Sequence, residues 1–377
     1  MDRPVRILHA HSTFALGGKE ARAVRLMNAF GGAAEHSIIS GMPDQLSARD
    51  AIDRSLRVDF PSEAPSLSGR PGVRLWRLAR YMRRFDLVLT YNWGAFDVVM
   101  ARRMFGGPPL IHHEDGFNQD EAGQLKSRRN LYRRLGLGAA HRLVVPSEQL
   151  EKVAARAWRQ PVDRIQRIPN GIPIERFARL PAGDAIPGLT RRQGEIVIGT
   201  VAGLRPVKNL PRLVRAFAAM RNKAAQLVIV GQGPESERIV AVARGLGVAD
   251  RLILPGFLPD PARYIGLFDI FALSSNSEQF PISLVEAMAA GLPAVCTGVG
   301  DIRAIVSADN RPLIVEPEDE AAFTAALDSL ADRSDLRRTI GLANRERAAA
   351  EYDERRMIEH YARLYGEAIR RPRAFMP

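Results

Sequence analysis

Two glutamates lie eight positions apart in the segment SEQFPISLVEAMAAGLP, with a proline between them. Glu278 precedes Pro281 and Glu286 follows it, and proline suits the first turn of a helix, where its missing N–H would have no partner. Three amides near the start of that helix would be free to bind an anion, those of Phe280, Ile282 and Ser283. The first carboxylate could bind hydroxyls, the amides could bind phosphates, and the second carboxylate could bind a second set of hydroxyls. The pattern therefore indicates a site for a sugar linked to a nucleoside diphosphate.

Two cations in the segment LRPVKN could serve the same ligand. Breaking a sugar–phosphate bond leaves negative charge on the departing diphosphate. Arg205 can bind it as a two-pronged fork and Lys208 as a compact point charge. Because no D-x-D pair follows a strand, we expect these cations to act without a metal ion. The alternative is two surface bases beside a proline turn.

Two glycine pairs follow apolar segments and could let the backbone approach the same ligand. Gly17 and Gly18 come after the first such segment, and Gly231 and Gly233 come after a later one. The second pair resembles the start of a dinucleotide fingerprint, but Ser236 replaces its third glycine. We interpret Gly231 and Gly233 as a tight turn that lines a nucleoside pocket.

The segments that must position these residues repeat one pattern, an apolar strand followed by a helix. Short apolar segments predict strands at 5–10, 86–91, 109–113, 142–147, 195–202, 225–231, 251–256, 270–273 and 293–297. Amphipathic patterns predict helices near 19–30, 73–84, 209–222, 235–245 and 282–290. The alternation is typical of an α/β protein with parallel sheets that helices cover on both faces.

A chain of 377 residues is long enough for two such domains. Residues 181–194 are rich in Pro and Gly and are expected to link a first domain, residues 1–180, to a second, residues 195–355. The ligand is expected in a cleft between them. We expect residues 356–377 to form a last helix and tail that pack towards the first domain.

The net charge of +12 is concentrated in the first half of the chain. Residues 1–180 contain 29 Lys and Arg against 18 Asp and Glu, whereas residues 181–377 contain 25 against 24. A basic half could bind an anionic membrane, nucleic acid or a phosphorylated acceptor, or it could be a solvated surface. Its basic runs, 74–84 and 126–134, contain few aromatic residues, so we expect no nucleic-acid partner.

Other features of the sequence indicate the compartment. The single cysteine, Cys296, excludes an internal disulfide framework and fits a reducing environment. The N-terminus leads directly into a strand without the apolar core of a signal peptide, and no stretch is long and apolar enough to span a membrane. We therefore expect a cytoplasmic protein, with the inner face of the membrane as a candidate peripheral location.

The whole set of motifs resembles the retaining glycosyltransferases of family 4, the glycosyl transferases group 1 type, which have two Rossmann-like domains in a GT-B fold. The resemblance covers nearly the whole chain. Besides the segment around Glu278 it rests on GGKE (17–20), VVPSEQL (144–150), IPNGIPIERF (168–177), GTVAGLRPVKN (199–209) and LVIVGQGPE (227–235).

The resemblance implies a role for each matching residue. Glu278 would hold sugar hydroxyls and Glu286 the ribose hydroxyls of the nucleotide, while Arg205 and Lys208 would hold the diphosphate. The remaining donor-binding positions would be Gly17, Gly18, Gly203, Gly231, Gly233, Phe280, Pro281, Ile282 and Ser283. The first domain would bind the acceptor and the second the nucleotide-sugar donor.

The acceptor side departs from the commonest pattern of the family, in which a histidine near the reacting carbon ends the strand that matches PLIHHEDG. Asp115 takes that position here and His113 lies two residues earlier; we prefer Asp115, because strand alternation would put both on one side. Adjacent residues of HHED point to opposite faces, so we expect no metal site. Candidate acceptor-binding residues are Asn92, Trp93 and Asn170, although Trp93 could equally belong to the core.

The residues and the resemblance together predict a metal-independent glycosyltransferase without a cofactor, and the resemblance implies that it is retaining. A sugar would pass from a nucleoside-diphosphate donor, UDP-linked before GDP-linked, to a glycan or lipid-linked acceptor of surface polysaccharide synthesis. One alternative is a nucleotide-sugar epimerase on the same architecture, which would need no acceptor. A basic nucleic-acid-binding protein is a further alternative, which the charge alone favours.

Overall fold

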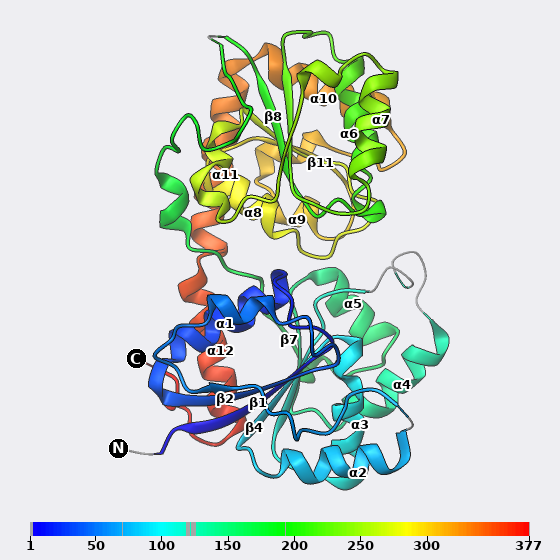
Figure 1. The fold of residues 1–377 in the computed structure, drawn as a ribbon, viewed down its shortest axis with the longest axis vertical. Helices are drawn as coiled ribbons and strands as arrows, with labels where there is room; N and C mark the ends of the chain where they lie inside the picture. The colour runs from blue at the N-terminus through cyan, green and yellow to red at the C-terminus, as the bar shows by residue number, and fades with distance from the viewer. Residues whose placement is uncertain (1–2, 70, 118–120, 122–125, 193, 377) are drawn as a thin grey trace. The chain divides into compact units, whose positions relative to one another are not determined.

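The computed structural model describes residues 3–69, 71–117, 121, 126–192 and 194–376. The chain forms two compact units (Figure 1). The N-terminal unit comprises Met1–Asn170 and Arg355–Pro377, and the C-terminal unit comprises Gly171–Glu354. Each unit contains one parallel sheet with helices on both faces, which confirms the predicted α/β class.

The N-terminal unit is built on a seven-stranded parallel sheet in the order β3-β2-β1-β4-β5-β6-β7. Its strands are β1 (Val5–His11), β2 (Ala34–Ser40), β3 (Val58–Asp59), β4 (Leu87–Tyr91), β5 (Leu110–His113), β6 (Arg142–Val145) and β7 (Ile165–Arg167). Every residue of β4 and β5 is buried, as expected for central strands covered on both faces. Four of these strands, β1, β4, β5 and β6, confirm the predicted ones.

Helices cover both faces of this sheet. On one face, α1 (Gly18–Phe30) shares a core with Ile7 and Leu89. On the other, Leu8 and Val88 share a core with α2 (Pro71–Met82), α3 (Phe96–Phe105) and α5 (Glu148–Arg156), and α4 (Ser127–Leu137) packs beside α3. Neighbouring strand residues thus enter different cores, which is the strand period of two.

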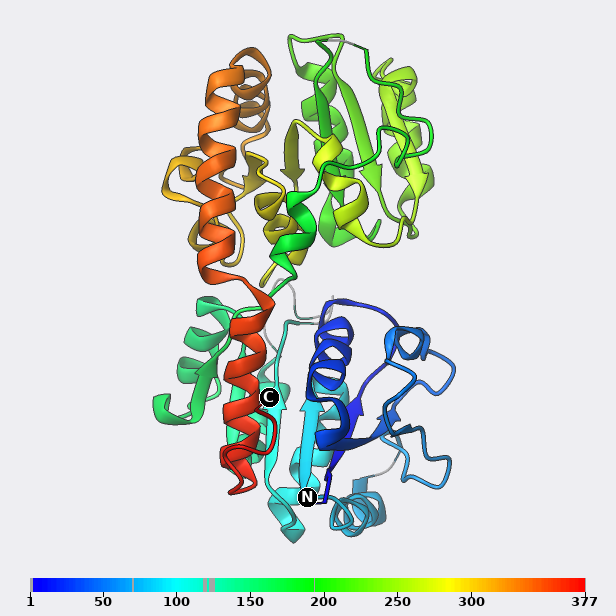
Figure 2. The ribbon, with the colours of Figure 1, turned by 90° about the vertical axis from the view of Figure 1, so that its left-hand side faces the viewer.

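The last helix, α12 (Glu354–Ala368), packs on the first face although its sequence follows the C-terminal unit. Figure 2 shows it lying along the N-terminal unit. Met357, Tyr361, Leu364 and Tyr365 are buried there against α1 and the sheet. These residues recur at helical spacing, so the amphipathic pattern of the tail decides which side of α12 is buried.

The C-terminal unit has a six-stranded parallel sheet in the order β10-β9-β8-β11-β12-β13. Its strands are β8 (Val197–Val201), β9 (Gln226–Val230), β10 (Leu252–Gly256), β11 (Ile270–Leu273), β12 (Ala294–Thr297) and β13 (Ile314–Val315). All but the short edge strand β13 were predicted from apolar runs, and these predictions are confirmed.

Two groups of helices cover this sheet. One face carries α6 (Leu210–Ala219), α7 (Ser236–Gly245) and α10 (Glu320–Asp332), and the other carries α8 (Ile282–Ala289) and α9 (Ile302–Ile305). The long helix α11 (Ser334–Glu351) packs against α8. The predicted linker, residues 181–194, lies inside this unit, where Ile186 is 1% exposed in the core.

Each sheet has a point at which the chain changes its direction of winding. In the N-terminal unit this point lies between β1 and β4, and in the C-terminal unit it lies between β8 and β11. Ligands of doubly wound α/β sheets bind outside the carboxyl ends of the strands at such points. The loops that follow these four strands are therefore the first places to look for a site.

In the described part of the chain, no helix combines the length and the hydropathy needed to cross a bilayer.

Candidate functional site

In the C-terminal unit, the loops at the winding point carry the predicted cations and one of the predicted glutamates. Arg205 and Lys208 lie in the loop after β8, around a short 3-10 turn at Pro206–Lys208. Glu278 lies in the loop after β11. The two loops are joined by hydrogen bonds from the Asn276 amide to Val207 O (2.8 Å) and from Ser274 Oγ to Lys208 O (3.2 Å).

Lys208 and Glu278 form an ion pair across these loops. The Lys208 Nζ to Glu278 Oε1 distance is 2.5 Å, and the Ser275 hydroxyl donates to the same oxygen at 2.6 Å. The Lys208 side chain is 23% exposed and that of Glu278 is 9% exposed. The structure thus brings together two residues separated by 70 positions, and it adds Ser275, which sequence reasoning missed.

Arg205 lies at the start of the same turn with its side chain exposed. Within the described residues, no carboxylate pairs with its guanidinium. Gly203, two residues earlier, is also exposed. This loop therefore presents one paired cation and one cation that is open to an anion from solution.

Gly231 and Gly233 hold the loop after β8 in place. A Cβ on Gly231 would lie 1.9 Å from the carbonyl oxygen of Ala202, and one on Gly233 would lie 2.5 Å from that of Leu204. The Leu204 amide also donates to Gln232 O at 3.0 Å. No larger residue fits where the two loops pack backbone to backbone, which explains the glycine pair that the sequence displays.

Helix α8 begins directly after the Glu278 loop. Pro281 is its N-cap, one position before the first helical residue. The amides of Ile282 and Ser283 are the first of the helix and have no carbonyl of an earlier turn to bond. The Phe280 ring packs edge-on against Tyr352 at 5.6 Å between ring centres.

Glu286 lies one turn inside α8 and is half-buried. Burial raises the pKa of Tyr264, and the negative charge of Glu286 raises it further, which places the carboxylate in the electrostatic range of that phenol. Glu278 therefore lies in the loop before α8, and Glu286 lies in the second turn of that helix.

Another residue that sequence reasoning missed supports Glu278 from behind. A Cβ on Gly300, which has a φ of 58°, would lie 2.1 Å from the Glu278 carbonyl oxygen. The loop after β12 thus packs directly on the Glu278 backbone. The only sequence signal for this contact is the Gly-Val-Gly run at 298–300, which by itself indicates no more than a turn.

In the N-terminal unit, the loops at the winding point carry Gly17 and Asn92. Gly17 is the N-cap of α1 and Gly18 its first residue, and both are exposed. The loops after β1 and β4 touch closely, because a Cβ on Gly94 would lie 2.1 Å from the Ser12 Cβ. The start of the loop between β1 and α1 therefore lies beside the loop that contains Asn92.

Asp115 lies just beyond β5 and is held by groups from several elements. Arg22 of α1 binds both carboxylate oxygens, with 2.9 Å from Nη2 to Oδ2, and its Nη1 donates to Asn170 Oδ1 at 2.9 Å. The Asp115 amide donates to Asn92 Oδ1 at 2.7 Å. Three of the predicted residues, Asn92, Asp115 and Asn170, are thus gathered around Arg22, whose side chain is 3% exposed.

His113, the other candidate, is buried beside this group but bonds to other residues. Its Nε2 accepts from the Tyr365 hydroxyl at 2.9 Å, and its Nδ1 donates to Thr90 O at 3.2 Å. Burial first, and then the charge of Arg22, lower the pKa of His113 well below its usual value of 6.5. Both ring nitrogens are occupied within the unit, so His113 is a neutral structural neighbour of the Asp115 cluster.

Trp93 packs against protein groups on several sides. Its ring stacks on Phe96 at 5.6 Å and meets Tyr132 edge-on at 5.7 Å between ring centres. The guanidinium groups of Arg129 and Arg133 lie 5.1 and 5.0 Å from the ring centre. These contacts favour the core interpretation of Trp93 over stacking on a sugar.

Arg22 is the main residue that sequence reasoning missed in the N-terminal unit. It lies two positions beyond the GGKE motif, and basic residues on an amphipathic helix usually face water. Tyr361 of α12 lies under it, with 5.7 Å from the Arg22 Cζ to the ring centre. Across the described ranges, no group of three or more His, Cys, Asp and Glu side chains is arranged to hold a metal ion.

Comparison with known proteins adds to this geometry. A model of the glycosyl transferases group 1 family matches residues 184–347, and a model of glycosyltransferase family 4 matches residues 16–176. One curated relative, the D-inositol 3-phosphate glycosyltransferase of Salinispora arenicola, is 26% identical over 79% of this chain and 72% of its own. Another, the N-acetyl-alpha-D-glucosaminyl L-malate synthase of Bacillus anthracis, is 27% identical over 47% of each chain.

The matches to the first three curated relatives span 47%, 53% and 58% of their lengths. Among solved structures, HepE of Anabaena in complex with UDP superposes with a TM-score of 0.78 over 96% of this chain and 100% of its own, at 18% identity. That likeness is one of fold.

Proposed function

The chain belongs to the glycosyl transferases group 1 family, and from that premise we propose that it moves a sugar from a nucleoside-diphosphate sugar to an acceptor, with retention at the anomeric carbon and without a metal ion. UDP is the first choice of nucleotide, because the HepE structure contains UDP, and GDP is the second. The observation that carries the proposal is the Lys208–Glu278 pair with exposed Arg205 beside it, at the winding point of the C-terminal sheet.

The donor's diphosphate binds between Arg205, Lys208 and the first amides of α8. Charge-assisted hydrogen bonds of this kind are each worth about 1.5–3 kcal/mol, and those that strengthen as charge develops lower the barrier. Lys208 turns from Glu278 to the phosphate when the donor binds, and the Ser275 hydroxyl keeps Glu278 in place. Glu278 then accepts hydrogen bonds from sugar hydroxyls, and Glu286 accepts those of the ribose.

The acceptor binds at the carboxyl edge of the N-terminal sheet. Asp115, fixed by Arg22 and by the Asn92 side chain, accepts a hydrogen bond from the attacking hydroxyl and orients it. The phosphate oxygen that leaves the sugar takes the hydroxyl proton as the new bond forms on the same face. The sugar passes through an oxocarbenium-like state, and neither carboxylate forms a covalent bond to it.

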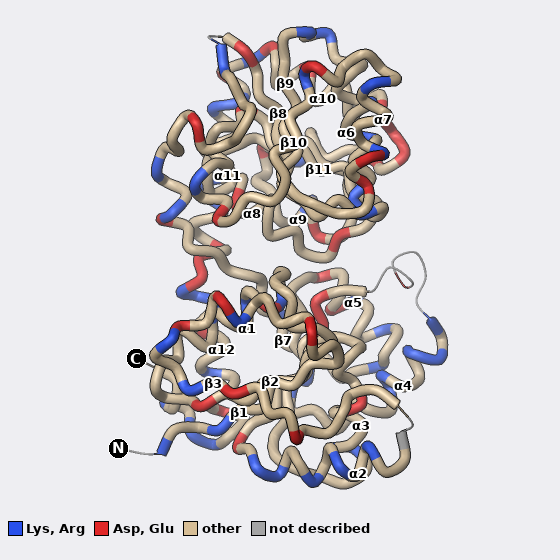
Figure 3. The backbone as a smooth tube through the Cα atoms, in the orientation of Figure 1, with Lys and Arg blue, Asp and Glu red and all other residues tan. Residues whose placement is uncertain are grey.

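The acceptor is a glycan or a lipid-linked precursor of a surface polysaccharide, reached at an anionic membrane face. The surface of α2 and of the two residues after it supports this part. Exposed arginines lie there, namely Arg77, Arg80, Arg83 and Arg84 (Figure 3). The Arg80 guanidinium lies 5.6 Å from the centre of the Trp76 ring, and Trp76 is 47% exposed. Sedimentation with anionic but not with neutral vesicles is expected, and absence of sedimentation with both removes the membrane from the proposal.

The transfer itself is tested by a thermal-shift screen of UDP- and GDP-linked sugars, followed by measurement of nucleoside diphosphate release with and without candidate acceptors. A donor at 100 times its Kd stabilises the folded chain by about 2.7 kcal/mol. Lys208→Ala and Glu278→Ala should each lower turnover by at least about 100-fold with an unchanged circular dichroism spectrum.

Lys223→Ala is the matched control, because Lys223 lies just before β9, at the opposite edge of the same sheet. Near-normal turnover in the Lys208 or Glu278 variant contradicts the donor site. Isomerised sugar formed from donor alone would instead identify an epimerase.

A further inference from the structure

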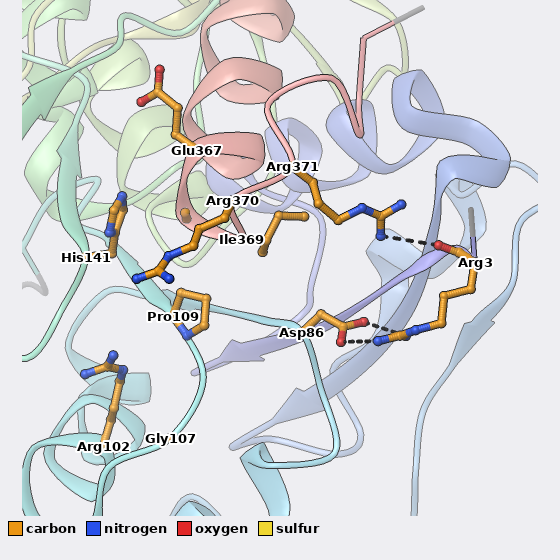
Figure 4. Close-up of a pocket in the computed structure, with 11 residues that line it drawn as sticks. Arg3, Asp86, Arg102, Gly107, Pro109, His141, Glu367, Ile369, Arg370 and Arg371 are labelled. Atoms are coloured by element: carbon orange, nitrogen blue, oxygen red, sulfur yellow. Dashed lines mark hydrogen bonds and ion pairs between the residues drawn. The ribbon is translucent and has the colours of Figure 1, made fainter. Parts of the chain in front are cut away.

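A cavity lies at the amino edge of the N-terminal sheet, opposite the edge that carries Asp115. Its volume is about 620 Å³, and it is lined by residues that lie one or two positions before four strands, Arg3, Asp86, Pro109 and His141, and by the end of α12 (Figure 4). The Asp115 cluster lies beyond the carboxyl ends of the same strands, which rise about 3.3 Å per residue. The length of the sheet therefore separates this cavity from the Asp115 cluster.

One end of the cavity is strongly basic. Arg102, His141 and Arg370 come from three different elements and converge there in Figure 4. Arg102 is fixed in place, because its Nε donates to Pro108 O and its Nη1 donates to Ala139 O, both at 2.7 Å. Within the described residues no carboxylate pairs with Arg102 or Arg370. A rigid guanidinium and a second unpaired guanidinium thus face the same space.

The two carboxylates on the lining do not neutralise this end. Asp86 binds Arg3 through both oxygens, at 2.7 and 2.9 Å, and accepts from the Arg6 amide at 2.9 Å. In Figure 4 the carboxylate of Glu367 points away from Arg102 and Arg370. The lining contains four arginines and one histidine against these two acids, so its net charge is positive.

Arg370 reaches the cavity from a strained backbone. It lies two residues beyond α12 with a φ of 57°, a conformation in which helix ends usually carry glycine. An arginine there costs stability that a glycine would not. Strain of this kind is informative when the side chain concerned points into a cavity.

The electrostatic environment of His141 also indicates that this end of the cavity is positive. Burial lowers its pKa below 6.5, and the positive charges of Arg142, Arg102 and Arg164 lower it further, while Glu367 acts in the opposite direction. The electrostatic potential at the basic end of the cavity is therefore positive, which favours the binding of an anion.

We propose that this cavity binds a phosphoryl group, in a phosphomonoester or a diphosphate, which Arg102 and Arg370 grip as two guanidinium forks. A tetrahedral dianion has enough oxygens for both forks, whereas a single carboxylate would be saturated by one. The volume lies in the range of small-molecule sites, so the phosphoryl group can belong to a larger molecule. Free phosphorylated metabolites and phospholipid headgroups share this chemistry.

The test uses the full chain carrying Arg205→Ala and Lys208→Ala, so that the loop assigned to the donor contributes no binding. Titration calorimetry with inorganic diphosphate, at constant ionic strength in chloride, should show one saturable site. Adding Arg370→Gly should weaken binding about 10- to 100-fold, the loss expected for one charge-assisted contact. Because glycine suits the backbone at this position, this variant should melt no lower than its parent.

Arg363→Ala is the matched control, because Arg363 is an exposed arginine of α12 outside the cavity lining, and its binding should equal the parent's. Absence of saturation at millimolar diphosphate overturns the proposal, as does undiminished binding after Arg370→Gly. Glycerol 3-phosphate and vesicles containing phosphatidic acid form the remaining arms. Arg370-dependent binding of the first identifies a soluble source, and Arg370-dependent binding of only the second identifies the lipid.

Discussion

Each unit places a charge pair beyond the carboxyl ends of its strands, but the two pairs are built differently. In the N-terminal unit, Arg22 and Asp115 are 3% and 12% exposed and share a bidentate contact that Asn92 and Asn170 extend. In the C-terminal unit, Lys208 is 23% exposed and reaches one oxygen of Glu278, with Arg205 exposed beside it. The first pair is closed because both of its side chains are largely buried, whereas the second is open on the side of its cation only, since Glu278 is as buried as Asp115.

The difference suits the two roles that we assign. A buried bidentate pair fixes a carboxylate in one orientation, but it cannot release either partner without leaving a buried charge. Lys208 is partly exposed and makes a single contact, so it loses less when it changes partner, and the Ser275 hydroxyl stays hydrogen-bonded to the Glu278 carboxylate. The N-terminal site is thus preorganised to orient a hydroxyl, and the C-terminal site is arranged to exchange a carboxylate for a phosphate.

Histidine, tryptophan and cysteine are also divided between the two units. All seven histidines belong to the N-terminal unit, at positions 9, 11, 36, 112, 113, 141 and 360. So do all three tryptophans, at positions 76, 93 and 158, whereas the single cysteine, Cys296, is buried in the C-terminal unit. Tryptophan fluorescence therefore reports unfolding of one unit, and the reactivity of the thiol reports unfolding of the other.

The largest expected effect is acid destabilisation of the N-terminal unit. Burial lowers the pKa of His9, His11 and His113 well below 6.5, and that of His36 to about 4. These rings stay neutral in the folded state, while the unfolded chain takes up protons below about pH 6.5. Stability is therefore complete above that pH and is lost as the pH falls towards the folded-state values. Each ring costs about 1.4 kcal/mol between pH 7.5 and 5.5.

Urea titrations at the two pH values measure this loss. The tryptophan transition should move to lower urea at pH 5.5, by up to about 5 kcal/mol for four rings. The urea-dependent reaction of Cys296 with dithiodipyridine, corrected for the intrinsic effect of pH on the reagent, should move little. If the two transitions shift equally between the two pH values, acid destabilises both units alike and the predicted difference between them is wrong.

The next largest effect is expected from breaking the closed pair. Arg22→Met leaves a buried carboxylate without its cation and should destabilise the N-terminal unit by about 3–5 kcal/mol in urea, read from tryptophan fluorescence. Lys208→Ala, read from Cys296 reactivity, should cost the C-terminal unit about 1 kcal/mol or less. Equal losses in the two variants would remove the distinction between a closed and an open pair.

The sequence alone was sufficient for much of the open site. The apolar runs before Arg205 and Glu278 predict parallel strands, and residues that follow such strands meet at one edge of a sheet. That the two strands, β8 and β11, are direct neighbours is known only from the structure. Local signals also located the glycine turn at 231–233 and the start of α8. Local sequence signals could not predict the partner of each charged side chain, such as Ser275 for Glu278.

The closed site was harder to predict, because its contacts join distant segments. Arg22 and Asp115 are 93 positions apart, and an arginine on an amphipathic helix gives no sign of burial. The expectation that His113 and Asp115 share one side rests on strand alternation, but β5 ends at His113, so the alternation does not extend to Asp115. Tyr365, which bonds His113, comes from a helix at the other end of the chain.

The smallest expected effect distinguishes the roles of Lys208 and Ser275, the two partners of Glu278. If Lys208 leaves the carboxylate when a donor binds, Ser275 is the contact that keeps Glu278 in position. Ser275→Ala removes one hydrogen bond and should lower kcat by about 5- to 10-fold, roughly 1–1.5 kcal/mol, with little change in the Cys296 transition. KM for the donor should change less, because the diphosphate supplies most of the binding. Ser277→Ala removes a nearby hydroxyl and should leave kcat unchanged, because in the described part of the chain the hydrogen bonds to the Glu278 carboxylate come from Lys208 and Ser275. Equal kcat values in the two variants would mean that Lys208 alone positions Glu278, and the exchange of partners at the open site would then have to be abandoned.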